Sequence, residues 1–258
     1  MDHHINPLAV HIQTIKRRLV VIGAAIFASL IVTFSFSGQM VAWLNRPFQN
    51  QLVFYGPTEA LFASIKVSLL AAVILGLPII FYQCWKFVEP ALLPKEQRWA
   101  IPLFVLAAGL FALGLVFCNL VILPLVIDFF VSFGLDRDVT PQLSVGTYID
   151  FNVKFLLIFG CAFELPLVMT LLAVTGAVSA QMFARYRKHA ILSNLILAAI
   201  ITPDATLFTM LLMAVPLMAL YEIGILGARF FGRSSTGGGI DLPVDPDLPI
   251  GTAGTRTR

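Results

Sequence analysis

The amino-acid sequence is poor in charge. Of its 258 residues only 12% are Asp, Glu, Lys or Arg, whereas 59% are apolar, and the mean hydropathy is +0.90. Soluble domains carry about 25% charged residues, so this composition excludes a soluble globular domain. We expect an integral membrane protein, and nothing in the chain indicates binding to nucleic acid.

Signatures of enzymes and metal sites are missing as well. The chain contains no HExxH motif, no Gly-x-Ser-x-Gly elbow and no P-loop, which argues against a metalloprotease, a serine hydrolase and a nucleotide hydrolase. Its three cysteines have neither CxxC spacing nor a neighbouring histidine, so neither a disulfide framework nor a zinc site is expected. We therefore expect no enzymatic activity and no cofactor.

The chain does contain a series of long apolar runs. A bilayer core of roughly 30 Å needs about 20 helical residues. The predicted fold is an all-α integral membrane protein with six transmembrane helices, the last two short. The expected spans are about 19–36, 61–82, 99–126, 151–175, 190–201 and 207–222. Pro203 and Asp204 separate the last two runs, because a proline removes a backbone donor and ends a helix.

Basic residues alternate along the connections between these runs. Lys and Arg concentrate before the first span, between the second and third, between the fourth and fifth and after the last, whereas the third connection is rich in Asp. By the positive-inside rule, both termini are expected in the cytoplasm. The absence of a transit peptide favours a bacterial cell membrane. Residues 1–233 form the predicted membrane domain, and 234–258 a disordered tail rich in Gly, Ser, Thr, Pro and Asp.

One carboxylate, Glu164, lies inside the fourth apolar run. A carboxylate near the bilayer centre costs roughly 2.5–3.5 kcal/mol on insertion scales, so it normally lines a cavity, meets a partner or protonates. The structural alternative is a neutral acid hydrogen-bonded to a neighbouring helix. Pro166 frees backbone carbonyls nearby, and a polar notch at mid-membrane is expected. Lys154, earlier in the same run, has Asp150 as its candidate partner four residues away.

The second connection, residues 82–98, mixes aromatic and charged side chains, as suits a membrane interface. Glu89 and Glu96 are carboxylates among cations in this segment. They either balance those neighbouring cations or receive a cation from a ligand, and residue chemistry alone leaves both possibilities open.

Several motifs together resemble one known family. They are Tyr82-Gln83 with Trp85, Phe87, Pro90-Ala91-Leu92 and Glu96; Phe163-Glu164-Leu165-Pro166; Thr202-Pro203-Asp204; and Pro216 followed by Tyr221-Glu222-Ile223-Gly224. Their order is similar to that of TatC, the polytopic subunit of the twin-arginine protein translocase, over residues 7–229. Pro47 also falls where the family has a proline, and the resemblance implies a structural role for it.

The resemblance implies a function and partners. TatC-like proteins, together with TatB, bind the twin-arginine signal peptides of folded precursors and recruit TatA for transport driven by the proton-motive force. The carboxylate matching Glu96 contacts the arginines of the signal, and it accepts a guanidinium fork that lysine cannot reproduce. The other implied signal-binding residues are Arg98, Phe87, Trp85, Arg17 and Thr14. The implied partner-contacting residues are Glu164, Pro166, Thr209 and Met210. Membrane lipid and an oligomeric complex complete the expected partners.

Two departures from the family pattern stand in the N-terminal segment. Thr14 replaces a common acidic residue, and Lys16 replaces a usual arginine, so recognition is expected to rest on Glu96, assisted by Glu89 or backbone carbonyls. Thr209 and Met210 stand where some members have a glutamine. The rival hypothesis from the residues is a six-span proton-coupled small-solute transporter that uses Glu164.

Overall fold

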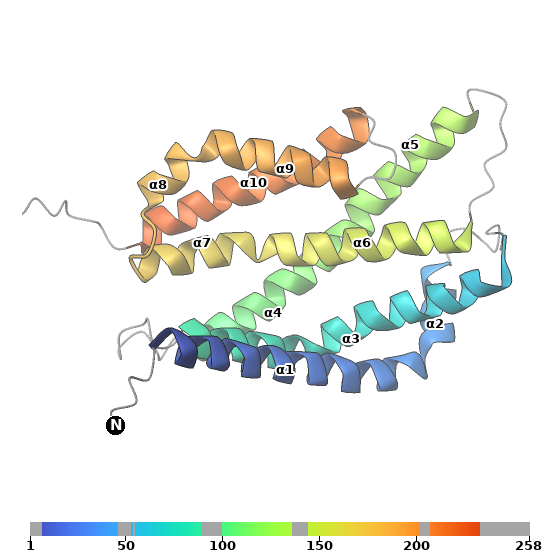
Figure 1. Ribbon diagram of the computed structural model, residues 1–258. Coiled ribbons are helices and arrows are strands. Elements are labelled where there is room, and N and C mark those ends of the chain that lie inside the picture. The colour runs from blue at the N-terminus through green and yellow to red at the C-terminus, as the bar shows by residue number, and fades with distance from the viewer. Residues whose placement is uncertain are drawn as a thin grey trace, which may run out of the picture.

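The protein is built from helices (Figure 1). The computed structural model describes residues 7–45, 53, 55–88, 100–135, 144–201 and 207–232. In those ranges the extended structure is limited to an isolated bridge between Val53 and Ser144. The elements are α1 (Pro7–Phe34), α2 (Ser37–Leu44), α3 (Pro57–Val88), α4 (Ala100–Phe117), a π-helical turn η4 (Cys118–Ile122), α5 (Leu123–Leu135), α6 (Val145–Phe163), α7 (Leu165–Val174), α8 (Ala180–Arg185), α9 (Arg187–Ile201) and α10 (Leu207–Phe231).

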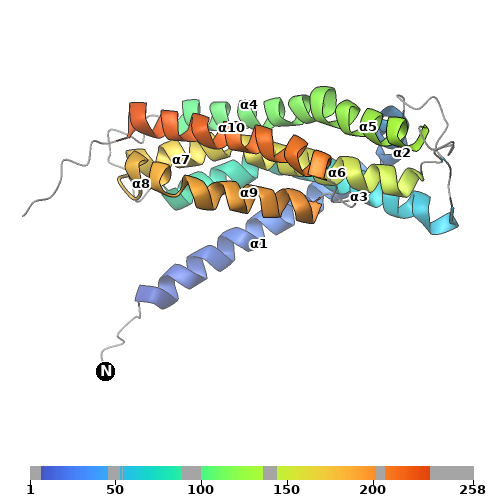
Figure 2. The ribbon, with the colours of Figure 1, turned by 90° about the horizontal axis from the view of Figure 1, so that it is seen from above.

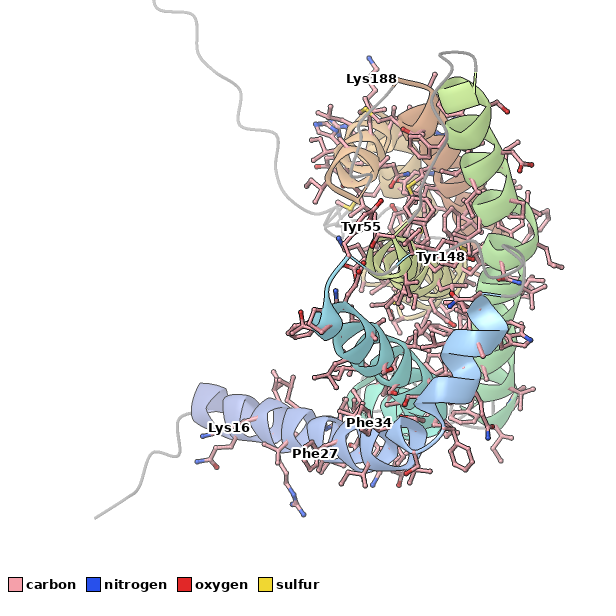
Figure 3. All side chains as sticks on the ribbon, turned by 90° about the vertical axis from the view of Figure 1, so that its right-hand side faces the viewer. Lys16, Phe27, Phe34, Tyr55, Tyr148 and Lys188 are labelled. Atoms are coloured by element: carbon pink, nitrogen blue, oxygen red, sulfur yellow. The ribbon has the colours of Figure 1, made fainter. Side chains whose placement is uncertain are left out.

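The long helices form a curved layer. Seen along the helix axes, α1 lies at one margin of an arc and α9 with α10 at the other (Figure 3). Towards its N-terminus α1 diverges from the other helices (Figure 2). Among the described side chains of α1, Thr33 alone is buried, and large apolar residues such as Phe27 and Ile31 are exposed. Such a surface suits hydrocarbon rather than water.

Five helical segments in the described ranges are long and apolar enough to cross a membrane. They are Gln13–Phe34, Pro57–Lys86, Ile101–Phe130, Val145–Val174 and Thr209–Phe231. The first four overlap the first four predicted spans, whose helical character is confirmed. The fifth predicted run, α9, has 15 residues and a length of about 22 Å, so its predicted shortness is also confirmed. Figure 1 shows α9 and α10 meeting short of the far ends of α3 and α5.

The prediction that the last helix is short as well is wrong. Helix α10 has 25 residues and continues past the expected end at residue 222 to Phe231. Glu222 does not end the helix, because its carboxylate lies at the surface and accepts a hydrogen bond of 2.6 Å from Arg187. The Tyr221 hydroxyl beside it donates to the carbonyl of Phe183 at 2.9 Å. These two contacts hold α10 against α8 and α9 at the point where the sequence predicted the last span to end.

The largest buried cluster centres on α6. Phe155 and Phe159 are fully buried and share a cluster with Met213 and Leu217 of α10. On the opposite side, α4 crosses α6 very closely. A Cβ atom built on Gly114 would lie 2.6 Å from the carbonyl oxygen of Phe159. Small residues allow membrane helices to approach in this way, and this crossing requires that position 114 carry no side chain.

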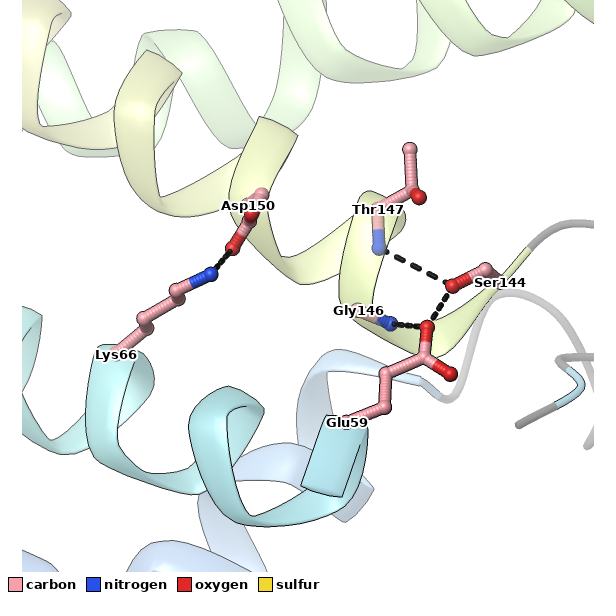
Figure 4. Close-up of polar contacts among 6 residues, drawn as sticks. All are labelled: Glu59, Lys66, Ser144, Gly146, Thr147 and Asp150. Atoms are coloured by element: carbon pink, nitrogen blue, oxygen red, sulfur yellow. Dashed lines mark hydrogen bonds and ion pairs between the residues drawn. The ribbon is translucent and has the colours of Figure 1, made fainter. Parts of the chain in front are cut away.

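A carboxylate ties the start of α3 to the start of α6 (Figure 4). One oxygen of Glu59 accepts hydrogen bonds from the Ser144 hydroxyl and, at 2.8 Å, from the Gly146 amide. Its other oxygen accepts the Tyr55 amide at 2.8 Å. Ser144 is itself the N-cap of α6 and accepts from the Thr147 amide at 3.3 Å. The charge of Glu59 also meets the positive end of the α6 dipole, which stabilises this junction.

An ion pair between Lys66 and Asp150 joins the same two helices one to two turns further along (Figure 4). The sequence had suggested Lys154 as the partner of Asp150, and this expectation is wrong. Asp150 lies on the side of α6 that packs against α3, so Lys66 reaches it, whereas Lys154 is exposed. Together with Glu59, this pair fixes one end of the layer.

The close crossing of α4 and α6 makes a prediction about stability. Gly114→Ala should lower the free energy of unfolding by about 1–3 kcal/mol, because the new methyl group meets a backbone carbonyl that cannot rotate away. Gly109→Ala on the same helix, where a Cβ would meet no atom within 4 Å, should be neutral or stabilise by up to about 1 kcal/mol. Thermal unfolding of the purified chain in detergent compares the two variants. Equal melting temperatures of the two variants would contradict the close approach of α4 and α6 at Gly114.

Candidate functional site

The fourth span is interrupted at Glu164. Helix α6 ends at Phe163 and α7 begins at Leu165, with Glu164 as the shared cap residue. Its amide bonds to the carbonyl of Cys161, three residues back, at 3.1 Å. Pro166 has no amide proton to continue the α-helical pattern, and the turn tightens here as a result. The interruption therefore follows directly from the sequence Glu-Leu-Pro.

The side chain of Glu164 is half-buried and incompletely paired. Its Oε1 atom is buried and meets no hydrogen-bond partner among the residues that the structure describes. The two ion pairs found in those ranges involve other residues. A buried acceptor without a donor costs roughly 1–3 kcal/mol, so this oxygen keeps an unmet capacity to accept a hydrogen bond.

Glu164 lines a cavity of about 720 Å³. Its wall comes from three segments that are distant in sequence: the end of α3, the first half of α4 and the length of α7. The lining residues are Phe81, Tyr82, Cys84, Trp85, Lys86, Ile101, Leu103, Phe104, Ala107, Glu164, Leu167, Val168, Leu171, Leu172, Thr175 and Ala177. Most of them are apolar, with Glu164 among the few polar exceptions.

The predicted signal-binding residues fall partly at the rim of this cavity. Trp85 is half-buried in its wall, beside Lys86, whose ammonium group lies 5.0 Å from the centre of the Tyr82 ring. Arg18 of α1 donates a hydrogen bond of 3.3 Å to the carbonyl of Gln83, which ties α1 to the end of α3. Gln83 lies between two residues that line the cavity, Tyr82 and Cys84, so this bond places Arg18 near the rim, although α1 diverges from the other helices further towards its N-terminus (Figure 2).

Thr14 and Arg17 lie exposed on that part of α1. Phe87 lies in the last turn of α3, but its side chain is outside the described part of the chain. Residues 89–99, with Glu89, Glu96 and Arg98, lie wholly outside it, as do Pro47, Pro203 and Asp204. The roles predicted for all of these residues stay predictions.

The predicted partner-contacting residues separate into two places. Pro166 is buried beside Glu164, and its Cα atom would lie 3.2 Å from a Cβ atom built on Gly224 of α10. Thr209 and Met210 lie at the start of α10 and do not line the cavity. Thr209 is fully buried, and of this pair only Met210 presents surface. The structure thus does not bring Thr209 and Met210 to Glu164.

Two features of the structure, one at the site and one at the opposite end of the layer, were not foreseen from the sequence. One is the convergence of Trp85 and Glu164 on a single cavity, for which no local pattern exists. The other is Glu59, which reads as an ordinary acidic residue in a first helical turn; the preceding Gly56-Pro57 was the available signal of a helix start. Among the described residues, no group of three His, Cys, Asp or Glu side chains could hold a metal ion.

Comparison with known proteins gives a consistent result. The family model "Sec-independent protein translocase protein (TatC)" matches residues 10–216. The TatC protein of Desulforapulum autotrophicum is 38% identical over 234 residues, which cover 88% of this chain and 86% of that protein. The TatC protein of Aquifex aeolicus is 37% identical over 236 residues, 89% of this chain and 96% of that protein.

Solved structures agree with the sequence relatives. The crystal structure of a twin-arginine translocase receptor, TatC, superposes with a TM-score of 0.79 at 36% identity, and the match covers 86% of this chain and all of that chain. A second crystal structure of the TatC receptor, in the detergent DDM, gives a TM-score of 0.78 at 37% identity over 86% of this chain and 99% of the other. Sequence and structure thus lead to the same assignment: this chain belongs to the TatC family of Sec-independent protein translocase proteins.

Proposed function

We propose that this protein is the receptor subunit of a twin-arginine translocase. In this proposal it binds the twin-arginine signal peptides of folded precursors and recruits TatA- and TatB-like single-span subunits for export driven by the proton-motive force. The observation that carries the proposal is that Trp85 and Glu164 line the same cavity. Trp85 lies beside the predicted signal-reading segment, and Glu164 is the predicted partner contact. The family assignment makes the protein a translocase component and not an enzyme.

The proposed topology has six spans with both termini in the cytoplasm of a bacterial cell. Helix α1 begins and α10 ends at the same end of the layer (Figure 1). Exposed cations such as Arg17, Lys188 and Arg229 belong to that end. Glu59 and Asp150 belong to the opposite end. This asymmetry supports the assignment of the cationic end to the cytoplasm, and α9 would then be the sixth, short span.

Recognition of the signal would take place at the cytoplasmic rim. Glu96 supplies a carboxylate to the planar guanidinium groups, which bind it through two parallel hydrogen bonds that a lysine cannot form. Arg98, Arg17 and Thr14 would flank this contact. Trp85 and Phe87 would offer aromatic surface to the apolar part of the signal that follows the arginines.

Docking of a single-span partner would take place deeper in the same cavity. The wall is apolar and fits the side of a transmembrane helix, while the unpaired oxygen of Glu164 requires a donor. A partner helix with one polar side chain at the matching depth would satisfy both conditions. Interhelical hydrogen bonds of this kind contribute about 0.6 to 2 kcal/mol in membranes.

The alternative of a proton-coupled solute transporter is not supported. The chain belongs to a translocase family. In addition, the buried side of α6 between Asn152 and Glu164 is occupied by Phe155, Phe159 and Phe163. These three aromatic side chains offer no proton donors or acceptors, so α6 does not provide a polar path to Glu164 along this side.

Recognition of the signal can be tested by comparing the wild-type protein with the Glu96→Gln variant, each with a twin-arginine and a twin-lysine signal peptide. Wild-type protein should bind a signal peptide with two arginines at least about tenfold more tightly than one with two lysines, a difference of about 1.4 kcal/mol. Glu96→Gln, which keeps the shape and removes the charge, should abolish this preference. Fluorescence anisotropy of labelled peptides with the purified complex measures all four affinities. An unchanged preference in the variant would contradict the role of Glu96.

Docking of the partner helix can be tested by two measurements, co-purification for binding and the melting temperature of the isolated chain for folding. Glu164→Leu should reduce co-purification of the single-span partner severalfold. The melting temperature of the isolated chain should stay the same or rise, because the variant removes an unpaired buried oxygen. Leu165→Ala, at a residue outside the cavity wall, should leave co-purification unchanged. If Glu164→Leu unfolds the isolated chain, or keeps its partner fully, Glu164 has a purely structural role.

A further inference from the structure

The bend between α8 and α9 carries a cluster of cations, most of which form no ion pair within the described residues and have no role in the proposed function. Residues 185–189 have the sequence Arg-Tyr-Arg-Lys-His, and all five are exposed. Figure 3 shows Lys188 projecting away from the neighbouring helices. It places three cations, Arg185, Arg187 and Lys188, within four residues; in the described part of the chain the one comparable group is Lys16-Arg17-Arg18 on α1.

The bend is held firmly against α10. Helix α8 is capped by Ser179, whose hydroxyl accepts from the Met182 amide at 3.2 Å, and its C-cap residue is Tyr186. The Tyr221 hydroxyl holds the carbonyl of Phe183, and Arg187 pairs with Glu222 at 2.6 Å. The bend is therefore a fixed structure in which the cations keep their positions.

Most of the positive charge at the bend remains unneutralised by the described residues. Glu222 is the one acidic side chain on the described parts of α8, α9 and α10, and it is committed to Arg187. Arg185 and Lys188 form no ion pair within the described ranges. Arg229, about two turns beyond Glu222 on α10, adds a further cation to the same end. An anion is therefore the complementary ligand.

An apolar surface begins directly beside these cations. Ile191, Leu192 and Ile196 are exposed on α9. The ring of Tyr186 lies at the junction, 5.5 Å from the ring of His189, as amphipathic rings do at membrane interfaces. Because α9 is about 22 Å long, shorter than a hydrocarbon core of roughly 30 Å, its charged start is drawn to the depth of the lipid phosphates.

We propose that the α8–α9 bend is a binding site for an anionic phospholipid. The lipid phosphate is held by Arg185 and Lys188, and the acyl chains lie along Ile191 and Leu192. An ordinary phosphatidylcholine shares the acyl chains but carries no net charge, so it binds more weakly. Cations near a membrane surface contribute about fivefold each in affinity for anionic lipid, so loss of both should weaken binding by at least about tenfold.

The test uses the purified full-length chain, delipidated in a neutral detergent. Phosphatidylglycerol and phosphatidylcholine are titrated separately, and native mass spectrometry counts the lipids that stay bound. The double variant Arg185→Gln/Lys188→Gln should lose preferential retention of phosphatidylglycerol. Arg185→Lys/Lys188→Arg, which keeps both charges, should retain it. Lys16→Gln/Arg17→Gln removes the same charge from the same end of the layer and should also retain it.

Three results would overturn the proposal. First, the Arg185→Gln/Lys188→Gln variant could retain as much phosphatidylglycerol as the wild type. Second, the Lys16→Gln/Arg17→Gln control could lose as much phosphatidylglycerol as the Arg185→Gln/Lys188→Gln variant is expected to lose. Third, the wild type could retain phosphatidylglycerol and phosphatidylcholine equally. A titration with inorganic phosphate, followed by thermal unfolding, distinguishes the source of the anion. Stabilisation by phosphate as large as that by phosphatidylglycerol would show a free-anion site and would also overturn the lipid assignment.

Discussion

The missing amide proton of Pro166 is the constraint on which the arrangement of the site depends. In a bilayer each backbone group must find a partner inside the protein, so a proline within a span forces a local change in hydrogen bonding. Here the change falls at Glu164, which becomes the junction of α6 and α7 and a lining residue of the cavity. The same junction lets Pro166 pack against α10 near Gly224. One residue thus sets both the position of the carboxylate and the contact that supports it.

The two ends of the curved layer differ in how firmly they are held. At one end, Glu59 and the Lys66–Asp150 pair connect α3 to α6, and the Tyr148 hydroxyl bonds to the carbonyl of Leu44 at 3.1 Å. At the other end, the last part of α3 and the first part of α4 face α7 across a cavity of about 720 Å³. One end of the layer is thus held by polar contacts between helices, whereas the other end keeps an open space between them.

The sequence predicts local features well and long-range convergence poorly. Apolar run length identified four long spans and the short α9, and the cost of a carboxylate in the membrane singled out Glu164. The length of α10 was missed because Glu222 is matched by Arg187, 35 residues away in sequence. The shared cavity of Trp85 and Glu164 was missed because it depends on the packing of three helices, and no spacing within one segment encodes such a meeting.

The proposed docking of a single-span partner places its helix along the cavity face of α7. Photo-crosslinking along α7 tests it most directly, with a photoreactive phenylalanine analogue placed singly at Leu167, Leu171 or Leu165 in the assembled complex. Leu167 and Leu171 line the cavity one turn apart, whereas Leu165 is exposed outside it. Crosslinks to the single-span partner are expected at residues 167 and 171, with background labelling at 165. Equal labelling at all three positions, or labelling at 165 alone, would contradict this placement.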